Sequence, residues 1–314
     1  MAAIVERIEK DAGVPGLVAI LSERLAPTDL QSLLLAVYRQ RSSRRRPADV
    51  LSQYEADRFV RPSEVSPQRF LAWEQAAFAS LPPQFEPLAL SPVCPLGSSA
   101  VLASLDQNWA LVTVRNNEVV SDSTNVLALE CAVRRRKLLR GHPKSTVPVH
   151  LAASHRLLRG QHFQGPLQKA HFACFALCSA GRDLGNWGFE IAALDLHIRF
   201  YLQALRAFLG PDVPLRLALT DWSAPAGAAA IETHLLAPLQ SEFATVDCVI
   251  DNGRTSGRGY YRDLCFHIEA TNHSGQALQL VDGGAVDWTQ RLLGSAKERL
   301  VSSGIGSERL CGEF

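Results

Sequence analysis

The 314-residue sequence carries almost no net charge and has no long hydrophobic run. Its 32 Lys and Arg residues face 31 Asp and Glu residues, which leaves a formal net charge of +1. No overall field therefore attracts nucleic acid or an anionic membrane, and such a partner would have to bind a local patch. No stretch approaches the roughly 18 apolar residues of a membrane span, and the N-terminus lacks a signal-peptide core. We expect a cytoplasmic protein with no membrane partner.

Cysteine pairs and the common catalytic motifs are missing as well. The seven cysteines are odd in number and include no C-x-x-C pair, so a disulfide framework is not expected. Cys174 and Cys178 lie four residues apart, but no further zinc ligands can be identified, which favours buried thiols. The sequence also has no Walker A loop, no G-x-G-x-x-G, no G-x-S-x-G and no H-E-x-x-H. No metal-ligating residue is predicted.

Local patterning divides the chain near residue 65. Residues 1–65 are predicted to form a helical N-terminal extension, with Thr28 as the cap of one helix and Pro47 at the start of another. Over 66–314, helices are predicted at 68–81, 125–139, 189–210 and 286–300. Strands are predicted at 109–115, 147–153, 155–161 and 171–180, with four more between 214 and 282. Because helices and strands do not alternate regularly, an α+β fold with a largely antiparallel sheet flanked by helices is favoured over a doubly wound sheet.

Arginines in unusual settings are the remaining candidates for chemistry. Arg159 lies in a predicted strand, and a second strand has Phe172 near its start, so a hairpin carries the arginine and the ring on its two arms. An arginine in a sheet is costly to bury unless it pairs with an anion, and its planar fork suits phosphate or carboxylate. An edge-strand arginine that reaches water is the alternative. Arg309 follows Gly304 and Gly306, which fits either a backbone close to a nucleotide phosphate or a plain turn into a helix.

The order of these features resembles the catalytic core of a class II aminoacyl-tRNA synthetase, in particular the histidyl-tRNA synthetase branch. SHRLLRGQ, a loop and HFACF resemble motif 2, which implies that Arg159 binds the α-phosphate of ATP and that Phe172 stacks on adenine. SGIGSERL resembles motif 3, which implies that Arg309 binds the γ-phosphate. The likeness spans roughly 66–314, and it implies a class II synthetase-like domain there, with ATP and Mg²⁺ as cofactors and Arg159 and Arg309 as catalytic residues.

The same resemblance implies a pocket for an amino acid or a related carboxylic acid. EVVSDSTNVLALE resembles the segment that binds the amino group, which places Asp122 and Thr124 near the substrate. YYRDLCF resembles the paired-tyrosine strand, so Tyr260 and Tyr261 would line the pocket together with Arg258. The helix at 66–81 followed by FEPLALSP resembles motif 1, which implies a homodimer. Fixed arginines and Mg²⁺ would bring two anions together without a protein nucleophile, which fits the missing catalytic motifs.

Three functions remain open. The leading hypothesis is a stand-alone class II synthetase paralogue that forms an acyl-adenylate. The chain departs from the family where Gln161 and Gly259 replace acids and where 256–257 read Ser-Gly in place of Arg-Gly. These departures favour a non-catalytic regulatory subunit resembling that of ATP phosphoribosyltransferase, whereas Arg159 and Arg309 oppose it. The chain ends five residues after Arg309, so no anticodon-binding domain is expected.

The third hypothesis is an RNA-binding accessory protein that uses two basic runs. The runs are Arg41, Arg44, Arg45 and Arg46, and then Arg134, Arg135, Arg136, Lys137 and Arg140. Each follows an amphipathic helix, where cations also suit the helix dipole without any partner. RNA binding through these runs would show a steep salt dependence.

Overall fold

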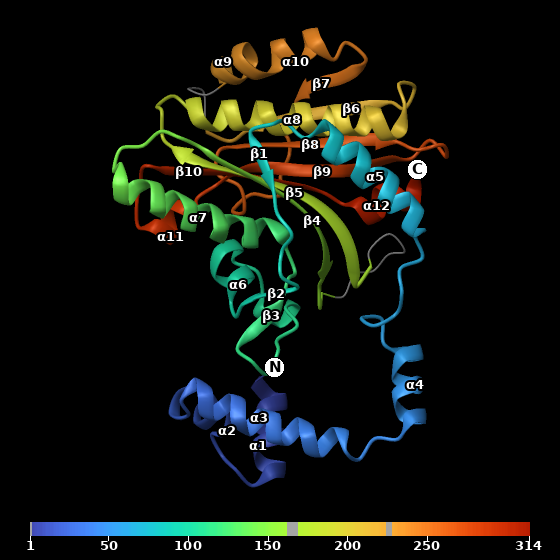
Figure 1. Ribbon diagram of the computed structural model, residues 1–314, viewed down its shortest axis with the longest axis vertical. Helices are drawn as coiled ribbons and strands as arrows, with labels where there is room; N and C mark the ends of the chain where they lie inside the picture. Colours follow the sequence, from blue (N-terminus) through green and yellow to red (C-terminus); the bar gives the residue numbers. More distant parts are fainter. Residues whose placement is uncertain (1, 162–168, 224–227) are drawn as a thin grey trace. The chain divides into compact units, whose positions relative to one another are not determined.

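The computed structural model describes residues 2–161, 169–223 and 228–314, and the chain forms two units (Figure 1). The first unit holds the residues up to Arg61 together with Val112–Glu118, and the second holds Pro62–Leu111 and Val119–Phe314. The loop of the predicted motif 2 hairpin, at 162–168, lies outside the described residues. All the candidate site residues belong to the second unit.

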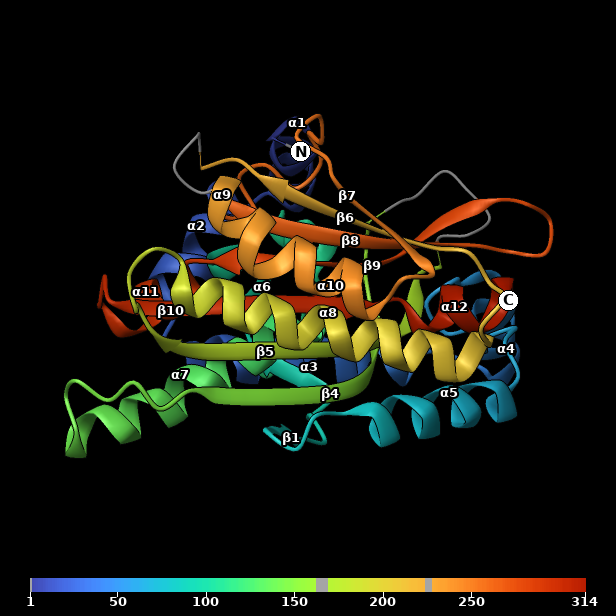
Figure 2. The same ribbon diagram turned by 90° about the horizontal axis from the view of Figure 1, so that it is seen from above.

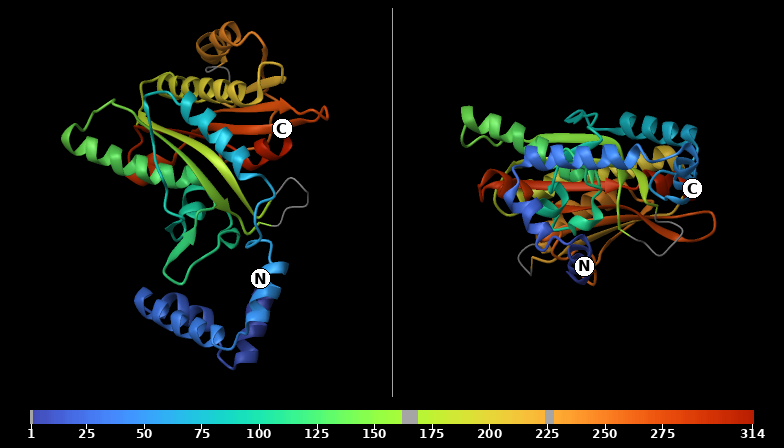
Figure 3. Two further views of the ribbon diagram at one scale, coloured as in Figure 1. Left: turned by 45° about the vertical axis from the view of Figure 1, so that its right-hand side comes forward. Right: turned by 90° about the horizontal axis from the view of Figure 1, so that it is seen from below.

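Helices make up most of the first unit, drawn in blue in Figure 3. They are α1 (Ala2–Ala12), α2 (Leu17–Ala19) with a π-helical turn over Ile20–Arg24, α3 (Pro27–Ser42) and α4 (Pro47–Ala56). The predicted Thr28 cap is wrong, because α3 already begins at Pro27, whose missing N–H costs nothing at a helix start. None of the residues described in these helices is buried, so their apolar side chains form no core.

An eight-stranded sheet forms the centre of the second unit. Across the sheet the strands run in the order β1 (Phe85–Pro87), β4 (Val149–Leu158), β5 (His171–Arg182), β10 (Glu298–Ile305), β9 (Ala277–Val286), β8 (Leu264–Thr271), β6 (Leu215–Asp221) and β7 (Val246–Ile250). β1 pairs with β4 and β6 with β7 in parallel, and the other neighbours are antiparallel. Two further short strands are β2 (Val93–Pro95) and β3 (Asn117–Val119). The predicted α+β class with a largely antiparallel sheet is confirmed.

Helices cover both faces of this sheet. One face carries α5 (Pro67–Ser80) and α8 (Gly188–Leu209). The other carries α6 (Ser98–Ala103), α7 (Ser123–Gly141) and α11 (Trp288–Leu293). Seen from above in Figure 2, α9 (Ala228–Ile231), a π-helical turn over Glu232–Leu236 and α10 (Ala237–Glu242) lie beside α8. The last helix, α12 (Ser307–Glu313), directly follows β10 and packs against β5 and α5.

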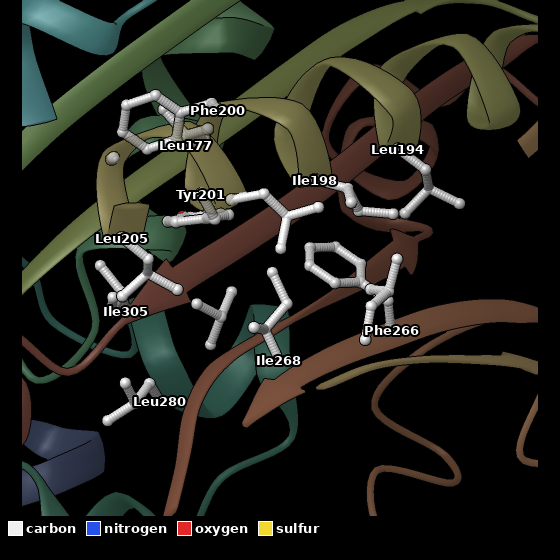
Figure 4. Close-up of a cluster of buried hydrophobic side chains, with 14 of the residues drawn as sticks. Leu177, Leu194, Ile198, Phe200, Tyr201, Leu205, Phe266, Ile268, Leu280 and Ile305 are labelled. Atoms are coloured by element: carbon white, nitrogen blue, oxygen red, sulfur yellow. The ribbon is translucent and has the colours of Figure 1, made fainter. Parts of the chain in front are cut away.

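The alternation of side chains in β5 separates two core layers. Phe175 and Leu177 face α5 and α8, whereas Ala176 and Cys178 face α7. In the first layer α8 presents apolar side chains at helical spacing toward the sheet (Figure 4), namely Leu194, Ile198, Tyr201 and Leu205. Each is at most 2% exposed, so each contributes on the order of 1.5–3 kcal/mol by burial. This agrees with the predicted helix over 189–210, which Gly210 ends with a φ of 89°.

The structure corrects several expected elements. Residues 109–115 are not a strand: a 3-10 turn over Gln107–Trp109 is followed by irregular chain with one isolated bridge at Val112. The strands predicted at 147–153 and 155–161 are one strand, β4. The helix predicted over 286–300 ends at Leu293, because Gly294 turns left-handed with a φ of 59°, and the missed central strand β10 begins at Glu298. None of the described helices combines the length and apolar character needed to cross a bilayer.

Candidate functional site

A cavity of about 370 Å³ opens where β5, β9 and β10 lie side by side. Its lining includes Arg159, which follows β4, Phe172 of β5 and Arg309 of α12. We call it the arginine cavity. The three residues to which the motifs assign ATP therefore line one space, although they come from three separate segments. At Gly304 in β10 an added Cβ would lie 3.2 Å from Cys174 Sγ, so a larger residue in this wall would require the cysteine side chain to shift.

The two arginines differ in how far their charge is neutralised. Arg159 donates from Nε to the carbonyl oxygen of Ser121 over 2.8 Å, and its Nη2 lies 3.4 Å from Asp122 Oδ2. Its guanidinium also lies 5.1 Å from the centre of the Phe172 ring, which is a cation–π contact. Arg309 donates from Nη1 to the carbonyl oxygen of Gln279 over 2.8 Å, and within the described residues no carboxylate pairs with it. Arg309 therefore offers a largely uncompensated positive charge to an anion.

The acidic residues of the arginine cavity are already paired. The carboxylate of Glu308 accepts a hydrogen bond from the N–H of Ala173 over 3.1 Å and another from Ser63 Oγ. Arg156 Nη2 lies 3.2 Å from the same carboxylate. Because this negative charge is compensated locally, it does not cancel the charge of Arg309. The electrostatics of the cavity favour an anionic ligand such as a polyphosphate.

The N-terminus of α7 brings together the residues expected to bind an amino group. Asp122 is the N-cap, and its Oδ1 accepts hydrogen bonds from the N–H of Thr124 over 2.9 Å and from its Oγ1 over 2.7 Å. The helix therefore begins at Ser123, two residues before the predicted start at residue 125. The other carboxylate oxygen of Asp122 faces Arg159, so this arginine links the helix N-terminus to the arginine cavity.

The paired tyrosines pack beside this helix start. The Tyr260 ring lies edge-on to Tyr261, with centroids 4.9 Å apart, and to Trp288 at 5.5 Å. Burial and the charge of Asp122 raise the pKa of Tyr260 well above its usual range, although a side-chain hydrogen bond with Thr124 and the charge of Arg159 lower it. Burial also raises the pKa of Tyr261. Both phenols therefore remain protonated at neutral pH and can donate hydrogen bonds.

Arg254, which the sequence did not single out, pairs with a residue of the arginine cavity. The Arg254 side chain is 4% exposed, and its Nη2 donates to Asp282 Oδ1 over 2.8 Å. Asp282 lines the arginine cavity, and its side chain is 40% exposed. Arg258, by contrast, is exposed, and its guanidinium lies 5.5 Å from the Trp222 ring centre. The structure thus brings together Asp122, Thr124, Tyr260 and Tyr261. Arg258 forms an isolated bridge with Tyr261 through its backbone, while its side chain turns to Trp222.

In the sequence, Arg254 and Arg258 share one glycine-containing loop, and the structure shows that Arg254 is the buried one of the two. Gly257 and Gly259 of this loop have φ of 84° and 85°, in the left-handed region that favours glycine. Burial raises the pKa of Asp282, while the charge of Arg254 and its hydrogen bond lower it. Burial and the charge of Arg254 lower the pKa of the neighbouring His267.

The donor set of the arginine cavity fits a nucleotide more clearly than a tightly bound metal. Arg159 and Arg309 suit phosphates, and Phe172 supplies an aromatic face. Asp282 is the carboxylate that could contact a phosphate-bound Mg²⁺, which usually keeps several waters. Within the described ranges no group of three or more His, Cys, Asp or Glu residues could hold a metal ion. Cys174 and Cys178 are free thiols, and burial raises the pKa of Cys174 to about 12.

Part of the second basic run is structural. Arg135 is fully buried and pairs with Glu298, while Arg134 pairs with Glu86 and Glu130 at the surface. In the first run, Arg46 pairs with Asp49. The predicted patch is therefore corrected for Arg135, which cannot contact RNA. Replacing it would test stability rather than binding, and the exposed members Arg136, Lys137 and Arg140 are the ones free to meet a polyanion.

Solved structures share this fold, although no protein-family model and no curated protein matches the sequence. An ATP phosphoribosyltransferase regulatory subunit/histidyl-tRNA synthetase from Bacillus halodurans superposes with a TM-score of 0.62 at 12% identity, over 80% of this chain and 81% of the other. Apo S. aureus histidyl-tRNA synthetase superposes with a TM-score of 0.56 at 14% identity, over 79% of this chain and 66% of the other. A putative threonyl-tRNA synthetase from Aeropyrum pernix superposes with a TM-score of 0.58 at 13% identity, over 78% of this chain and 59% of the other. At these identities the likeness shows the fold, which is that of the class II aminoacyl-tRNA synthetase catalytic core.

Proposed function

We propose that the protein binds Mg-ATP in the arginine cavity and an amino acid or related carboxylic acid beside the N-terminus of α7, and joins them as an acyl-adenylate. One observation carries the proposal: Arg159, Phe172 and Arg309 line a single cavity. Residues 66–314 would be the catalytic domain and residues 1–65 a helical extension. The volume of about 370 Å³ falls within the usual range for small-molecule sites.

The proposed reaction needs charge neutralisation from the protein rather than a nucleophilic side chain, because the substrate carboxylate is itself the nucleophile. The substrate carboxylate attacks the α-phosphorus of ATP, the acyl–phosphate bond forms, and pyrophosphate leaves. Arg159 would hold the α-phosphate and Arg309 the γ-phosphate, so that the repulsion between the two anions is offset in place. Mg²⁺ would neutralise phosphate charge, with Asp282 as its contact on this chain.

The acid would lie next to Asp122, whose carboxylate can accept hydrogen bonds from a substrate ammonium group. In the described structure this carboxylate lies 3.4 Å from Arg159 Nη2, so binding of both substrates would replace one internal ion pair with two external ones. Tyr260 and Tyr261 would border the same place, with phenol protons available for the substrate. Arg254 joins the proposal in place of Arg258, because it pairs with Asp282 at the arginine cavity.

The reaction is tested by ATP–pyrophosphate exchange with the full chain and a mixture of the standard amino acids. We expect exchange that requires the mixture and that falls at least tenfold in Arg159→Ala, equivalent to about 1.4 kcal/mol. Arg216→Ala is the matched control, because this exposed arginine on β6 lies outside the arginine cavity. Exchange that is equal in both variants would contradict the assignment of Arg159.

A non-catalytic regulatory subunit is the second candidate. It is supported by the likeness to the structure from Bacillus halodurans described above, and by the Ser-Gly at 256–257 in place of Arg-Gly. A subunit that only senses an amino acid needs no γ-phosphate arginine. Calorimetric binding of an amino acid without any binding of Mg-ATP would favour this candidate over the ligase.

We further propose that the protein forms the expected homodimer through α5 and β1. Leu71 and Phe78 of α5 are exposed, which suits a contact with a second copy. Sedimentation of the full chain tests this part separately. A dimer that Leu71→Glu converts into a monomer is the expected result, and a wild-type monomer would refute it.

A further inference from the structure

The junction of α3 and α4 in the first unit, drawn in blue in Figure 1, is rich in arginine. Between Asp29 and Asp49 the chain has five arginines and no acidic residue. The arginines are Arg39, Arg41, Arg44, Arg45 and Arg46, and all five are exposed. We call residues 39–46 the arginine-rich segment. It lies outside residues 66–314, so the proposed reaction does not use it.

Helix electrostatics account for only part of the arginine-rich segment. Arg39 and Arg41 lie in the last turn of α3, where cations suit the negative end of the helix dipole. Arg44, Arg45 and Arg46 come directly before the N-terminus of α4, where the dipole disfavours cations. Arg46 is the N-cap of α4, a position that usually holds Ser, Thr, Asp or Asn. Helix stability therefore does not explain this charge, and an anionic partner does.

Two arginines of the segment attach it to α4. Arg46 Nη2 lies 3.1 Å from Asp49 Oδ1. Arg45 donates from Nη1 to the side-chain oxygen of Gln53 and from Nη2 to the carbonyl oxygen of Asp49. These contacts hold the connection between the helices against α4, so the arginines stay close to the first turns of that helix.

The other three arginines keep an uncompensated charge. Arg39, Arg41 and Arg44 form no ion pair with any residue that the structure describes. Apart from Asp49, the acidic residues of the two helices lie at their far ends, at position 29 in the first turn of α3 and at position 55 in α4. Position 29 is about 18 Å from Arg41 along the axis of α3. Three guanidinium groups are therefore available to phosphates, which they suit in geometry and in charge.

Exposed tyrosines accompany the arginines on both helices. Tyr38 of α3 is 57% exposed, and Tyr54 of α4 is 46% exposed. Tyr38 and Arg41 are three residues apart, so they share one face of α3. Tyr54 directly follows Gln53, the residue that Arg45 contacts. Unpaired bases stack on aromatic rings while arginines bind the backbone phosphates, so this combination favours a single-stranded nucleic acid over an acidic protein or a lipid surface.

We propose that the arginine-rich segment, together with Tyr38 and Tyr54, is a binding site for single-stranded nucleic acid. The three uncompensated arginines would pair with phosphates, and the two rings would stack on bases. None of the residues in α3 and α4 is buried, so these side chains are accessible as they stand. The proposal does not rest on the acyl-adenylate reaction, because the segment and the arginine cavity share no residue.

Fluorescence anisotropy of a labelled oligouridylate, titrated with the full chain at several salt concentrations, tests the proposal. Replacement of Arg39, Arg41 and Arg44 by Ala should weaken binding at least tenfold. It should also reduce the slope of log affinity against log salt by about 2, since three phosphate contacts are lost. The matched control replaces the exposed residues 136, 137 and 140 of α7 by Ala, which removes the same number of positive charges and should leave binding unchanged.

The tyrosines separate base stacking from charge alone. Tyr38→Ala and Tyr54→Ala should each weaken binding about fivefold or more, whereas Tyr38→Phe keeps the ring and should bind like the wild type. An oligothymidylate of equal length compares DNA with RNA, and saturable binding of either supports the proposal. Inorganic polyphosphate and phosphatidylglycerol vesicles should compete poorly with the oligonucleotide.

Four results would overturn the proposal. They are no saturable binding of either oligonucleotide at low salt, equal affinity in the two triple variants, unchanged affinity in both Tyr→Ala variants, and equally effective competition by polyphosphate or by the vesicles. The last two would mean that the segment recognises charge without bases. Circular dichroism of each variant should match the wild type, because the replaced side chains are exposed and pack in no core.

Discussion

Replacement of Arg135 by Met should lower the free energy of unfolding by about 3–5 kcal/mol, the usual loss when one partner of a buried ion pair is removed. Arg135 on α7 and Glu298 at the start of β10 both have side chains with 0% exposure. Arg135 Nε and Nη2 donate to the two carboxylate oxygens over 2.8 and 2.9 Å. Its Nη1 and Nη2 also donate to the carbonyl oxygens of Val147 and Ser145. The substitution leaves the Glu298 charge buried without a partner and two carbonyls without donors.

The assay is urea unfolding followed by tryptophan fluorescence, with the midpoint and the slope fitted together. Arg134→Met is the matched control on the same helix. Arg134 is 29% exposed and pairs with surface carboxylates, so its loss should cost about 1 kcal/mol or less. The double variant Arg135→Met, Glu298→Leu removes both charges and should recover much of the loss. If Arg135→Met lost no more stability than Arg134→Met, the buried pair would not hold α7 against β10, and the reasoning would be refuted.

Three further predictions concern the same scaffold. Burial lowers the pKa of His197 to about 3 in the folded protein, whereas in the unfolded chain the pKa is near 6.5. Below about pH 6.5 the unfolded state therefore binds more protons than the folded state. Stability should therefore be complete above about pH 6.5 and fall by up to about 1.4 kcal/mol per pH unit below it. The measurement is urea unfolding across that range, where a slope equally steep in His197→Gln would contradict the assignment. Gly283→Ala should lower the free energy of unfolding by about 1–3 kcal/mol, because its Cβ would lie 2.4 Å from Ser303 Cβ. Thermal unfolding measures the loss, and Gly141→Ala, whose Cβ would meet nothing within 4 Å, is the control. Asp122→Ala should cost about 1 kcal/mol by loss of the α7 cap, and an unchanged urea midpoint would show that the cap contributes nothing.

The helices could be predicted from their long amphipathic patterns, whereas the short strands with polar residues could not be predicted. The helix of α8 could be predicted because its apolar residues repeat at helical spacing over 22 residues. The strand β10 has the sequence ERLVSSGI, with few β-branched or aromatic residues, so its sequence does not predict a strand. It lies at the centre of the sheet because its small residues fit between β5 and β9, where Ser303 lies opposite Gly283. That fit depends on neighbours that a single sequence does not reveal.

The part of the candidate site that comes from residues close together in the sequence could be predicted. Arg159 and Phe172 come from a strand–loop–strand segment, so their neighbourhood follows from the antiparallel pairing of β4 and β5. The pair of Arg254 and Asp282 was not predictable, because one lies in a loop and the other 28 residues later on β9. The loop between them turns at Gly257 and Gly259, which both have positive φ. Assignments that depend on such turns require the three-dimensional structure.

Titration of Mg-ATP into the full chain tests most directly the central claim that Arg309 and Phe172 serve one nucleotide. We predict saturable binding that Arg309→Ala and Phe172→Ala each weaken at least tenfold, about 1.4 kcal/mol, and that Arg216→Ala leaves unchanged. The combined Arg309→Ala, Phe172→Ala variant should lose binding altogether. Absence of binding at millimolar Mg-ATP, or equal binding in the wild type and both single variants, would contradict the account.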